Sequence, residues 1–154
     1  GFAVAVHVLK GGRLTLAPGC TGAAKVALRE MVSYADQRIQ FGRPIIDNQG
    51  VAFQLAEMAT QIDAARLLVW RASWMAVNGK PFTAAEGSMS KLFASETSKK
   101  VTAQAIQILG GNGYTREYPV ERMHRDSAIY TIFEGTSEIQ RLVIARTLSG
   151  MSIR

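Results

Sequence analysis

The stretch IFEGTSEIQR places the carboxylate of Glu134 between a bulky aromatic residue and a glycine. Ile132 and Phe133 would desolvate this carboxylate, as a general base that removes a proton from carbon requires. Gly135 gives the backbone freedom to turn an N–H group toward a substrate carbonyl. Alternatively, Glu134 only precedes the N-cap of a helix, where a negative charge is favourable. The residues alone leave these two interpretations open.

Other residues would suit a polyphosphate ligand. Arg38, at the expected end of a helix, offers a planar fork of donors that fits phosphate oxygens. A helix expected to begin at Thr136 would present free N–H groups and the positive end of its dipole. The GGNG sequence at residues 110–113 lets backbone approach a ligand closely. It follows an expected helix rather than a strand, so it is not a dinucleotide-binding fingerprint.

Charge and composition narrow the range of partners. The chain has 18 Lys and Arg against 12 Asp and Glu, a net charge of +6 that favours anionic ligands. These basic residues are scattered, so we expect no nucleic-acid partner. The single cysteine, Cys20, excludes an internal disulfide, fits a reducing compartment and is expected to be a small buried thiol. The two histidines lack the spacing of a metal site or a catalytic triad, so we expect no metal.

Helices are expected through most of the chain, because apolar residues recur at spacings of three and four. Pro18 and Gly19 mark a kink or a late start in the first helix. Thr83 and Glu86 form a capping box that would begin the third helix. Residues 110–114 are expected to form a tight turn in which the glycines and Asn112 tolerate a positive φ. The expected helices cover residues 14–38, 49–78, 83–109, 121–129 and 136–148.

This pattern predicts an all-α fold, an antiparallel up-and-down four-helix bundle whose fourth member is the last helix. A length of 154 residues with 47% hydrophobic content fits one domain, residues 1–154. No apolar run approaches the ~20 residues that a membrane span needs, so we expect no membrane span.

Several motifs occur in an order that resembles a known family. Each motif is weak alone, but seven in order, with helical spacing between them, are a specific signal. The whole chain resembles the C-terminal all-helical domain of the acyl-CoA dehydrogenases, flavoenzymes that introduce an α,β double bond into acyl-CoA thioesters. The motifs are GGR at 11–13, RxQFGxPI at 38–45, NQ at 48–49, QxxGGNGY at 107–114, YPVER at 118–122, RD at 125–126 and EGTSEIQR at 134–141.

The resemblance implies roles for the matching residues. Glu134 would be the base that removes the α-proton while a hydride passes from the β-carbon to FAD, and its backbone N–H would hold the thioester carbonyl. Arg13 would lie near the base and the acyl-CoA, and Gly135 would also contact the substrate. Some relatives carry the base immediately before the arginine of GGR. That position is Gly12 here, which leaves Glu134 as the candidate.

The resemblance also implies an FAD-binding set, part of which would reach the flavin of a neighbouring subunit. Arg38 would lie at the pyrophosphate, and residues 107–111 would line the adenosine portion. The implied partners are an electron-transfer flavoprotein as electron acceptor and further copies of the chain in a homodimer or homotetramer. The set is Arg38, Gln40, Phe41, Gln49, Gln107, Ile108, Leu109, Gly110, Gly111, Thr136 and Glu138.

The N-terminal helical domain and the middle β-domain of that family are absent from this sequence. We therefore expect a separate C-terminal domain that binds flavin poorly by itself. The expected location is the bacterial cytoplasm, or the mitochondrial matrix if the chain is eukaryotic. Two alternatives stay open: a non-catalytic helical oligomerisation module, and a related flavoprotein oxidase on the same fold.

Overall fold

Five α-helices account for most of the computed structural model, which describes residues 1–153 and all their side chains except those of residues 2, 3, 5–7, 9 and 10. The all-α class expected from the sequence is confirmed. Two-residue antiparallel strands, β1 (Ile39–Gln40) and β2 (Arg43–Pro44), form the turn after the first helix. The helices are α1 (Phe2–Gln37), α2 (Gln49–Val77), α3 (Glu86–Leu109), α4 (Val120–Ala128) and α5 (Ser137–Ser149), with short 3-10 helices η1 (Ile45–Asp47), η2 (Gly110–Tyr114) and η3 (Ile129–Thr131).

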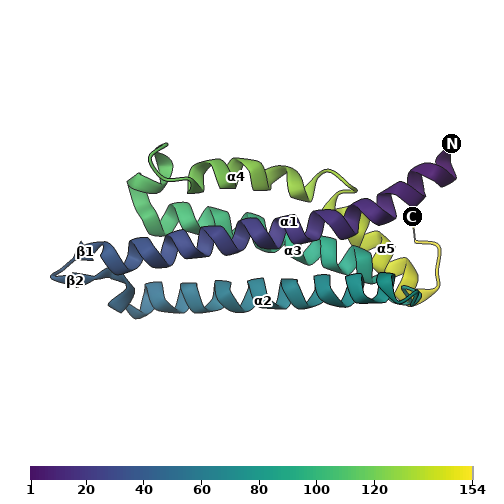
Figure 1. Ribbon diagram of the computed structural model, residues 1–154, viewed down its shortest axis with the longest axis horizontal. Helices are drawn as coiled ribbons and strands as arrows, with labels where there is room; N and C mark the ends of the chain where they lie inside the picture. Colours follow the sequence, from purple (N-terminus) through teal and green to yellow (C-terminus); the bar gives the residue numbers. More distant parts are fainter. Residues whose placement is uncertain (154) are drawn as a thin grey trace.

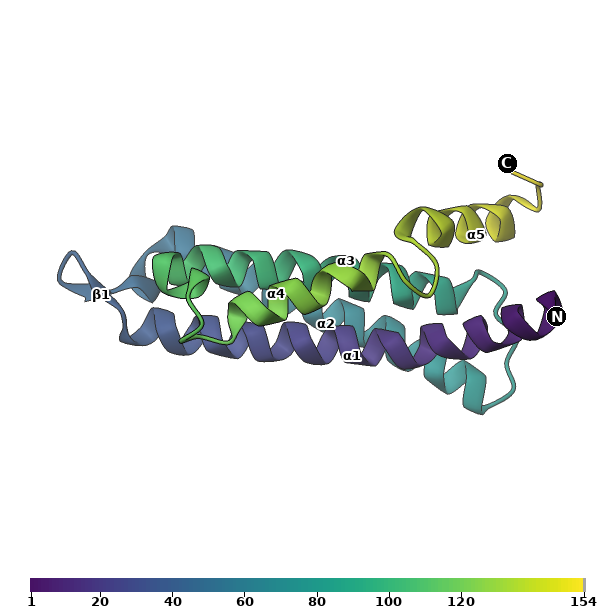
Figure 2. The ribbon, with the colours of Figure 1, turned by 90° about the horizontal axis from the view of Figure 1, so that it is seen from above.

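The first four helices run up and down in an elongated bundle (Figure 1). α1, α2 and α3 all pack on one another, and α4 lies along α3 and α1. α5 packs on α3 at the end of the molecule where both termini lie, to one side of the other helices (Figure 2). The expectation that the last helix is the fourth member of the bundle is therefore wrong. α4 takes that place, because the turn between η3 and α5 carries α5 outside the bundle.

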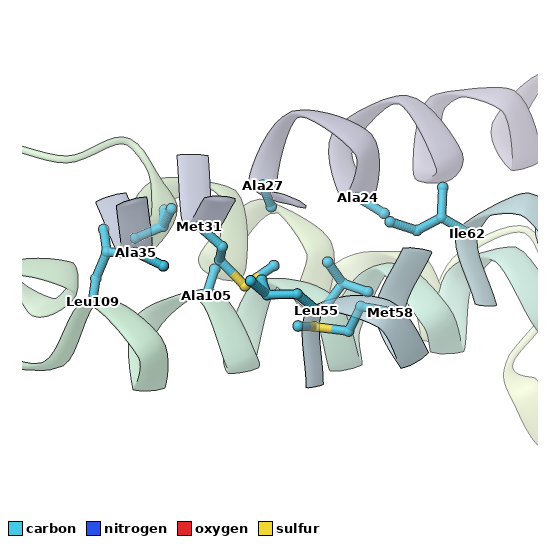
Figure 3. Packing of buried hydrophobic residues seen from close by; sticks show 11 residues of the cluster. Ala24, Ala27, Met31, Ala35, Leu55, Met58, Ile62, Ala105 and Leu109 are labelled. Carbon is cyan, nitrogen blue, oxygen red and sulfur yellow. The ribbon is translucent and has the colours of Figure 1, made fainter. Parts of the chain in front are cut away.

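The core is a seam of small and apolar side chains where α1, α2 and α3 meet (Figure 3). Its residues are spaced by three or four along each helix, as one face of a helix requires. Alanines on α1 leave room for longer side chains of the facing helices, which interdigitate with them. The seam consists of Ala24, Ala27, Met31 and Ala35 from α1, Leu55, Met58 and Ile62 from α2, and Val101, Ala105 and Leu109 from α3, closed by Val120.

A second buried cluster lies nearer the N-terminal part of α1. Cys20 is fully buried there with Ala17 and Ala94, and Tyr130 packs against the cluster. The expectation of a small buried thiol at Cys20 is confirmed. Tyr130 belongs to η3, so this cluster packs against the element that leads into the turn of Glu134.

α1 starts earlier than the sequence suggests. It begins at Phe2 and continues through Pro18 and Gly19, so the expected start at residue 14 and the alternative of a late start at Pro18 and Gly19 are both wrong. A proline removes a single backbone hydrogen bond, and the packing of a long helix compensates for this loss. The continuous helix places residues 11–13 on a rigid element.

The start of α3 does not use the expected capping box. The N-cap is Ala85, which has a φ of 58°, and Thr83 lies outside the helix. Glu86 is buried and accepts hydrogen bonds from Arg71 on α2 (3.0 Å) and from the backbone N–H of Ala84 (3.1 Å). The Glu86 carboxylate therefore pairs with Arg71 of α2 and does not form a capping box with Thr83.

The GGNG segment forms η2 rather than the expected turn with a positive φ at Asn112. Only Gly110 has a positive φ in this segment, of 62°. The side-chain amide of Asn112 donates a hydrogen bond to the hydroxyl of Tyr34 on α1 (2.8 Å). A Cβ built on Gly113 would lie 2.8 Å from the carbonyl oxygen of Ile106, so this glycine is needed for close packing.

Within residues 1–153, none of the helices combines the length and the apolar character that crossing a membrane would need.

Candidate functional site

Glu134 lies in a sharp turn between η3 and α5. Its φ is 56° and that of Gly135 is 90°, so two successive residues have left-handed backbone conformations. Such a conformation costs a non-glycine residue about 1–3 kcal/mol and persists where the surrounding structure imposes it. The turn therefore holds the Glu134 side chain in a defined direction at an energetic cost.

The carboxylate of Glu134 lies directly against the backbone of α1. A Cβ built on Gly12 would lie 2.8 Å from Glu134 Cδ and 3.0 Å from its Oε1. The Oε2 atom is buried, and it has no hydrogen-bond partner among the described residues. Burying a carboxylate oxygen without a hydrogen-bond donor lowers the stability of the folded chain. The same oxygen is free to accept a proton from a ligand.

Arg13 places a cation beside this turn. Its Nη1 donates a hydrogen bond to Ser88 Oγ (3.1 Å), whereas its buried Nε has no partner within the part of the chain that the structure describes. A Cβ built on Gly135 would lie 3.7 Å from Arg13 Nη2. Burial lowers the pKa of Arg13, and the negative charge of Glu134 opposes this shift. A carboxylate and a guanidinium thus share one partly buried site.

Two buried side chains hold the turn from within the protein. Lys91 Nζ donates a hydrogen bond to the carbonyl oxygen of Gly135 (2.7 Å). Gln140 Nε2 donates to the carbonyl oxygens of Glu134 (3.1 Å) and Gly135 (3.0 Å). Both side chains are fully buried. Burial lowers the pKa of Lys91, and the nearby thiol of Cys20 opposes this shift.

Sequence reasoning missed Lys91 and Gln140. One signal was present for Lys91, because it stands three residues before Ala94 and ten before Val101, on the stripe that α3 buries. A lysine on a buried stripe needs a specific partner. No comparable signal marks Gln140, since a glutamine four residues into a short helix is ordinary.

A pocket of about 620 Å³ opens beside Arg13 at the same end of the molecule. It lies between α1, the loop before α3 and α5, and most of its lining is apolar. Glu134 is not one of the described residues that line it, so the pocket adjoins the turn rather than containing it. The lining is Gly11, Arg13, Leu14, Ala76, Lys80, Phe82, Ala85, Gly87, Ser88, Val143 and Thr147.

The start of α5 carries two further residues of the expected flavin-binding set. Thr136 is the N-cap, and its Oγ1 accepts a hydrogen bond from the backbone N–H of Ile139 (3.3 Å). Glu138 is exposed in the first turn. Its own backbone N–H and the Thr136 hydroxyl lower the pKa of Glu138. Thr136 and Glu138 therefore lie within a few residues of Glu134, Gly135 and the neighbouring Arg13.

Most of the remaining set gathers around a pocket of about 450 Å³ near the β1–β2 turn. Phe41, Gln49 and Gln107 are not among the described residues that line this pocket. Phe41 is 99% exposed at the tip of the turn with a φ of 52°, and the two glutamines are exposed on α2 and α3. The lining is Tyr34, Arg38, Gln40, Ile45, Ile108, Leu109, Gly110, Gly111 and Asn112.

The two groups lie at opposite ends of the bundle. α1 carries Arg13 near one end, and Arg38 follows its last residue at the other (Figure 1). The 25 residues between them correspond to about 37 Å at the rise of an α-helix. One copy of this chain therefore does not bring Arg38 and Glu134 to the same reacting atom.

The structure offers no cluster of three or more His, Cys, Asp or Glu side chains arranged for a metal ion among the residues that it describes.

Gly12→Ala tests the contact between α1 and Glu134. Replacing a helical glycine by alanine normally stabilises a helix by about 0.5–1 kcal/mol. We expect this gain to be lost or reversed here, because the new methyl group would displace the carboxylate. The free energy of unfolding in urea measures the effect. In a Glu134→Ala background the gain should return, whereas an equal gain in both backgrounds would contradict the contact.

The comparisons with known proteins agree with this fold. The model of the family described as "Acyl-CoA dehydrogenase, C-terminal domain" matches residues 1–149. The mitochondrial short-chain specific acyl-CoA dehydrogenase of Bos taurus is 50% identical over 145 residues, which cover 94% of this chain and 35% of that protein. The Caffeyl-CoA reductase-Etf complex subunit CarC of Acetobacterium woodii is 47% identical over 148 residues, covering 96% of this chain and 39% of that protein.

A solved structure shows the same similarity. Butyryl-CoA dehydrogenase from Megasphaera elsdenii superposes with a TM-score of 0.93 at 44% identity, covering 97% of this chain and 39% of that chain. The present chain thus belongs to the acyl-CoA dehydrogenase family, as its C-terminal domain. It spans between a third and two-fifths of the length of these relatives.

Proposed function

We propose that this domain supplies the catalytic base of an FAD-dependent enzyme that introduces an α,β double bond into acyl-CoA thioesters. The observation that carries the proposal is the Glu134 carboxylate, held by a left-handed backbone against Gly12 with one buried, unpartnered oxygen. A side chain that serves only the helix dipole would need neither the strain nor the burial.

The residues of this chain would act on a bound thioester in a simple sequence. Glu134 takes the α-proton on a carboxylate oxygen, and the electron pair left on carbon forms the new double bond. The backbone N–H of Glu134 would donate a hydrogen bond to the thioester carbonyl oxygen and stabilise the negative charge that grows there. Arg13 would orient the substrate beside the base. When bound, FAD supplies the acceptor for the hydride that leaves the β-carbon.

The residues present fit a flavin, provided that two copies of the chain contribute. Thr136 and Glu138 adjoin the base, whereas Arg38, Gly110 and Gly111 line a separate pocket at the far end of the bundle. We propose that this far pocket receives the pyrophosphate and adenosine portion of a flavin bound by a neighbouring subunit. A guanidinium beside open glycine backbone suits those groups.

Exposed apolar side chains on α2 support a homo-oligomer. Phe53, Leu67, Trp70, Trp74 and Val77 are all more than half exposed. Spacings of 3, 4 and 14 residues place them on one side of α2, and exposed apolar residues gathered on one side of a helix are typical of a surface that another chain covers. The two tryptophans are therefore not buried within one chain, and we propose a second copy as their partner in a dimer or tetramer.

The partner and location follow from the same proposal. An electron-transfer flavoprotein would take the electrons, which the name of the Acetobacterium relative supports. Bacterial and mitochondrial relatives support the bacterial cytoplasm or the mitochondrial matrix. The two alternatives are an oligomerisation module without catalysis and a flavoprotein oxidase.

Flavin spectroscopy tests the proposal on the enzyme that carries this domain. We expect the purified enzyme to be yellow and its flavin absorbance to bleach when an acyl-CoA is added without oxygen. A protein that holds no flavin would overturn the proposal and support the oligomerisation module. Rapid oxygen uptake with the same substrate would instead identify an oxidase.

A further inference from the structure

We propose that Lys91 and Gln140 are positioning residues of the site, forming a clamp that holds the Glu134–Gly135 turn in its left-handed conformation. The inference rests on the proposed role of Glu134 as the base. Neither side chain would touch the reacting atoms, because both bind only the backbone carbonyls of the turn.

The clamp joins two helices to one short turn. Lys91 comes from α3, which is part of the bundle, and Gln140 comes from the first turns of α5. Together they make three hydrogen bonds of 2.7, 3.0 and 3.1 Å to two successive carbonyl oxygens. Fixing both carbonyls fixes the peptide planes on either side of Gly135. The clamp therefore sets the backbone of Gly135, whose φ is 90°, and one of the two peptide planes that define the φ of Glu134.

The burial of Lys91 indicates that its ammonium group has a specific task. Its side chain is fully buried, and no carboxylate of the described residues forms an ion pair with it. Burying an unpaired ammonium is unfavourable, and an apolar side chain could fill the same space. The charge-assisted hydrogen bond from the Lys91 ammonium to the Gly135 carbonyl is a strong contact that stabilises the turn.

Without the clamp, a change in the backbone of the turn would move the Glu134 carboxylate. Without Lys91, the Gly135 carbonyl keeps only the amide of Gln140, and Glu134 can relax toward an ordinary φ. The carboxylate would then leave its place against Gly12. A misplacement of about 1 Å in a reacting group can cost about a hundredfold in rate.

Lys91→Met in the complete flavin-loaded enzyme tests the clamp. Methionine keeps the length of the side chain and removes the donor and the charge. We expect kcat to fall by about tenfold or more, while KM and flavin content change by less than about twofold. Lys99→Met is the matched control, because Lys99 is exposed on the same helix, and it should leave kcat unchanged.

A double-mutant cycle separates positioning from a general structural role. If Lys91 acts through Glu134, Lys91→Met should have almost no further effect on kcat in a Glu134→Gln background. Equal losses in both backgrounds, or full kcat in Lys91→Met alone, would overturn the clamp. Full activity of Glu134→Gln by itself would instead overturn the proposed function.

Two further measurements keep the test decisive. If Lys91→Met does not fold, Gln140→Met removes the other half of the clamp without a change of charge and should give the same loss of kcat. Hydrogen exchange of this chain should show faster exchange at residues 133–136 in either variant than in Lys99→Met. Unchanged exchange there in a folded variant would also contradict the clamp.

Discussion

Glu134→Gln is expected to lower the rate of flavin reduction by acyl-CoA by about 10²–10⁴-fold or more in the enzyme that carries this domain. Glutamine has almost the same shape as glutamate, so it fits against Gly12 and keeps the backbone of the turn. It has no basic oxygen that can take a proton from carbon. Rapid mixing of the oxidised enzyme with substrate in the absence of oxygen, followed through flavin absorbance, measures this step directly.

Two observations make this result specific to the base. Flavin content should stay at the wild-type level, because the substitution changes no group of the far pocket. Glu117→Gln is a matched control, since Glu117 is exposed in the connection before α4. A rate near that of the wild type in Glu134→Gln would reject the base and favour the oligomerisation module.

The sequence predicted the helices well because their buried faces repeat at three and four residues. Leu55, Met58 and Ile62 lie in the core as that spacing requires, and Ala27 and Met31 face them from α1. Boundaries depend on competing local contacts, and there the predictions failed. The carboxylate of Glu86 binds Arg71 rather than completing a capping box.

The position of Glu134 in a motif was visible in the sequence, but the geometry of its site was not. A positive φ is unusual for glutamate, and no local pattern announces it. The contact with Gly12 joins the first helix to the last turn, so it exists only after the bundle is formed. Gly12 could be read from the sequence as unable to act as a base, whereas the contact that a side chain there would make with the Glu134 carboxylate came from the structure.

Buried polar residues are the part of the site that sequence patterns describe least well. Lys91 and Gln140 belong to residue types that usually lie on surfaces, and only Lys91 has a spacing that places it on a buried stripe. Their burial is set by the turn that they bind. Residues that position a strained backbone are therefore found from hydrogen bonds and burial rather than from spacing.

The second large expected effect is slow alkylation of the Cys20 thiol in the folded chain. Burial raises the pKa of Cys20 from 9.0 to about 12, while the charge of Lys91 opposes this rise. Each pKa unit changes the thiolate fraction tenfold, so at pH 8 the folded chain should hold about a thousandfold less thiolate than the unfolded chain. Alkylation by iodoacetamide should slow by at least this factor, because the thiolate is the reactive form.

Intact mass measures this reaction cleanly, because the chain has one cysteine and can gain one adduct. In urea the same chain should be labelled at the rate of a free thiol, which provides the reference. The sign of the pH dependence follows from the raised pKa. The stability that Cys20 contributes is complete below pH 9, where the unfolded thiol is also neutral, and it is lost as pH rises toward 12. Labelling of the folded chain within minutes at pH 8 would show that the cluster around Cys20 opens to solvent. Lys91, whose charge acts on Cys20, would then hold the Glu134–Gly135 turn with less rigidity than a positioned base requires.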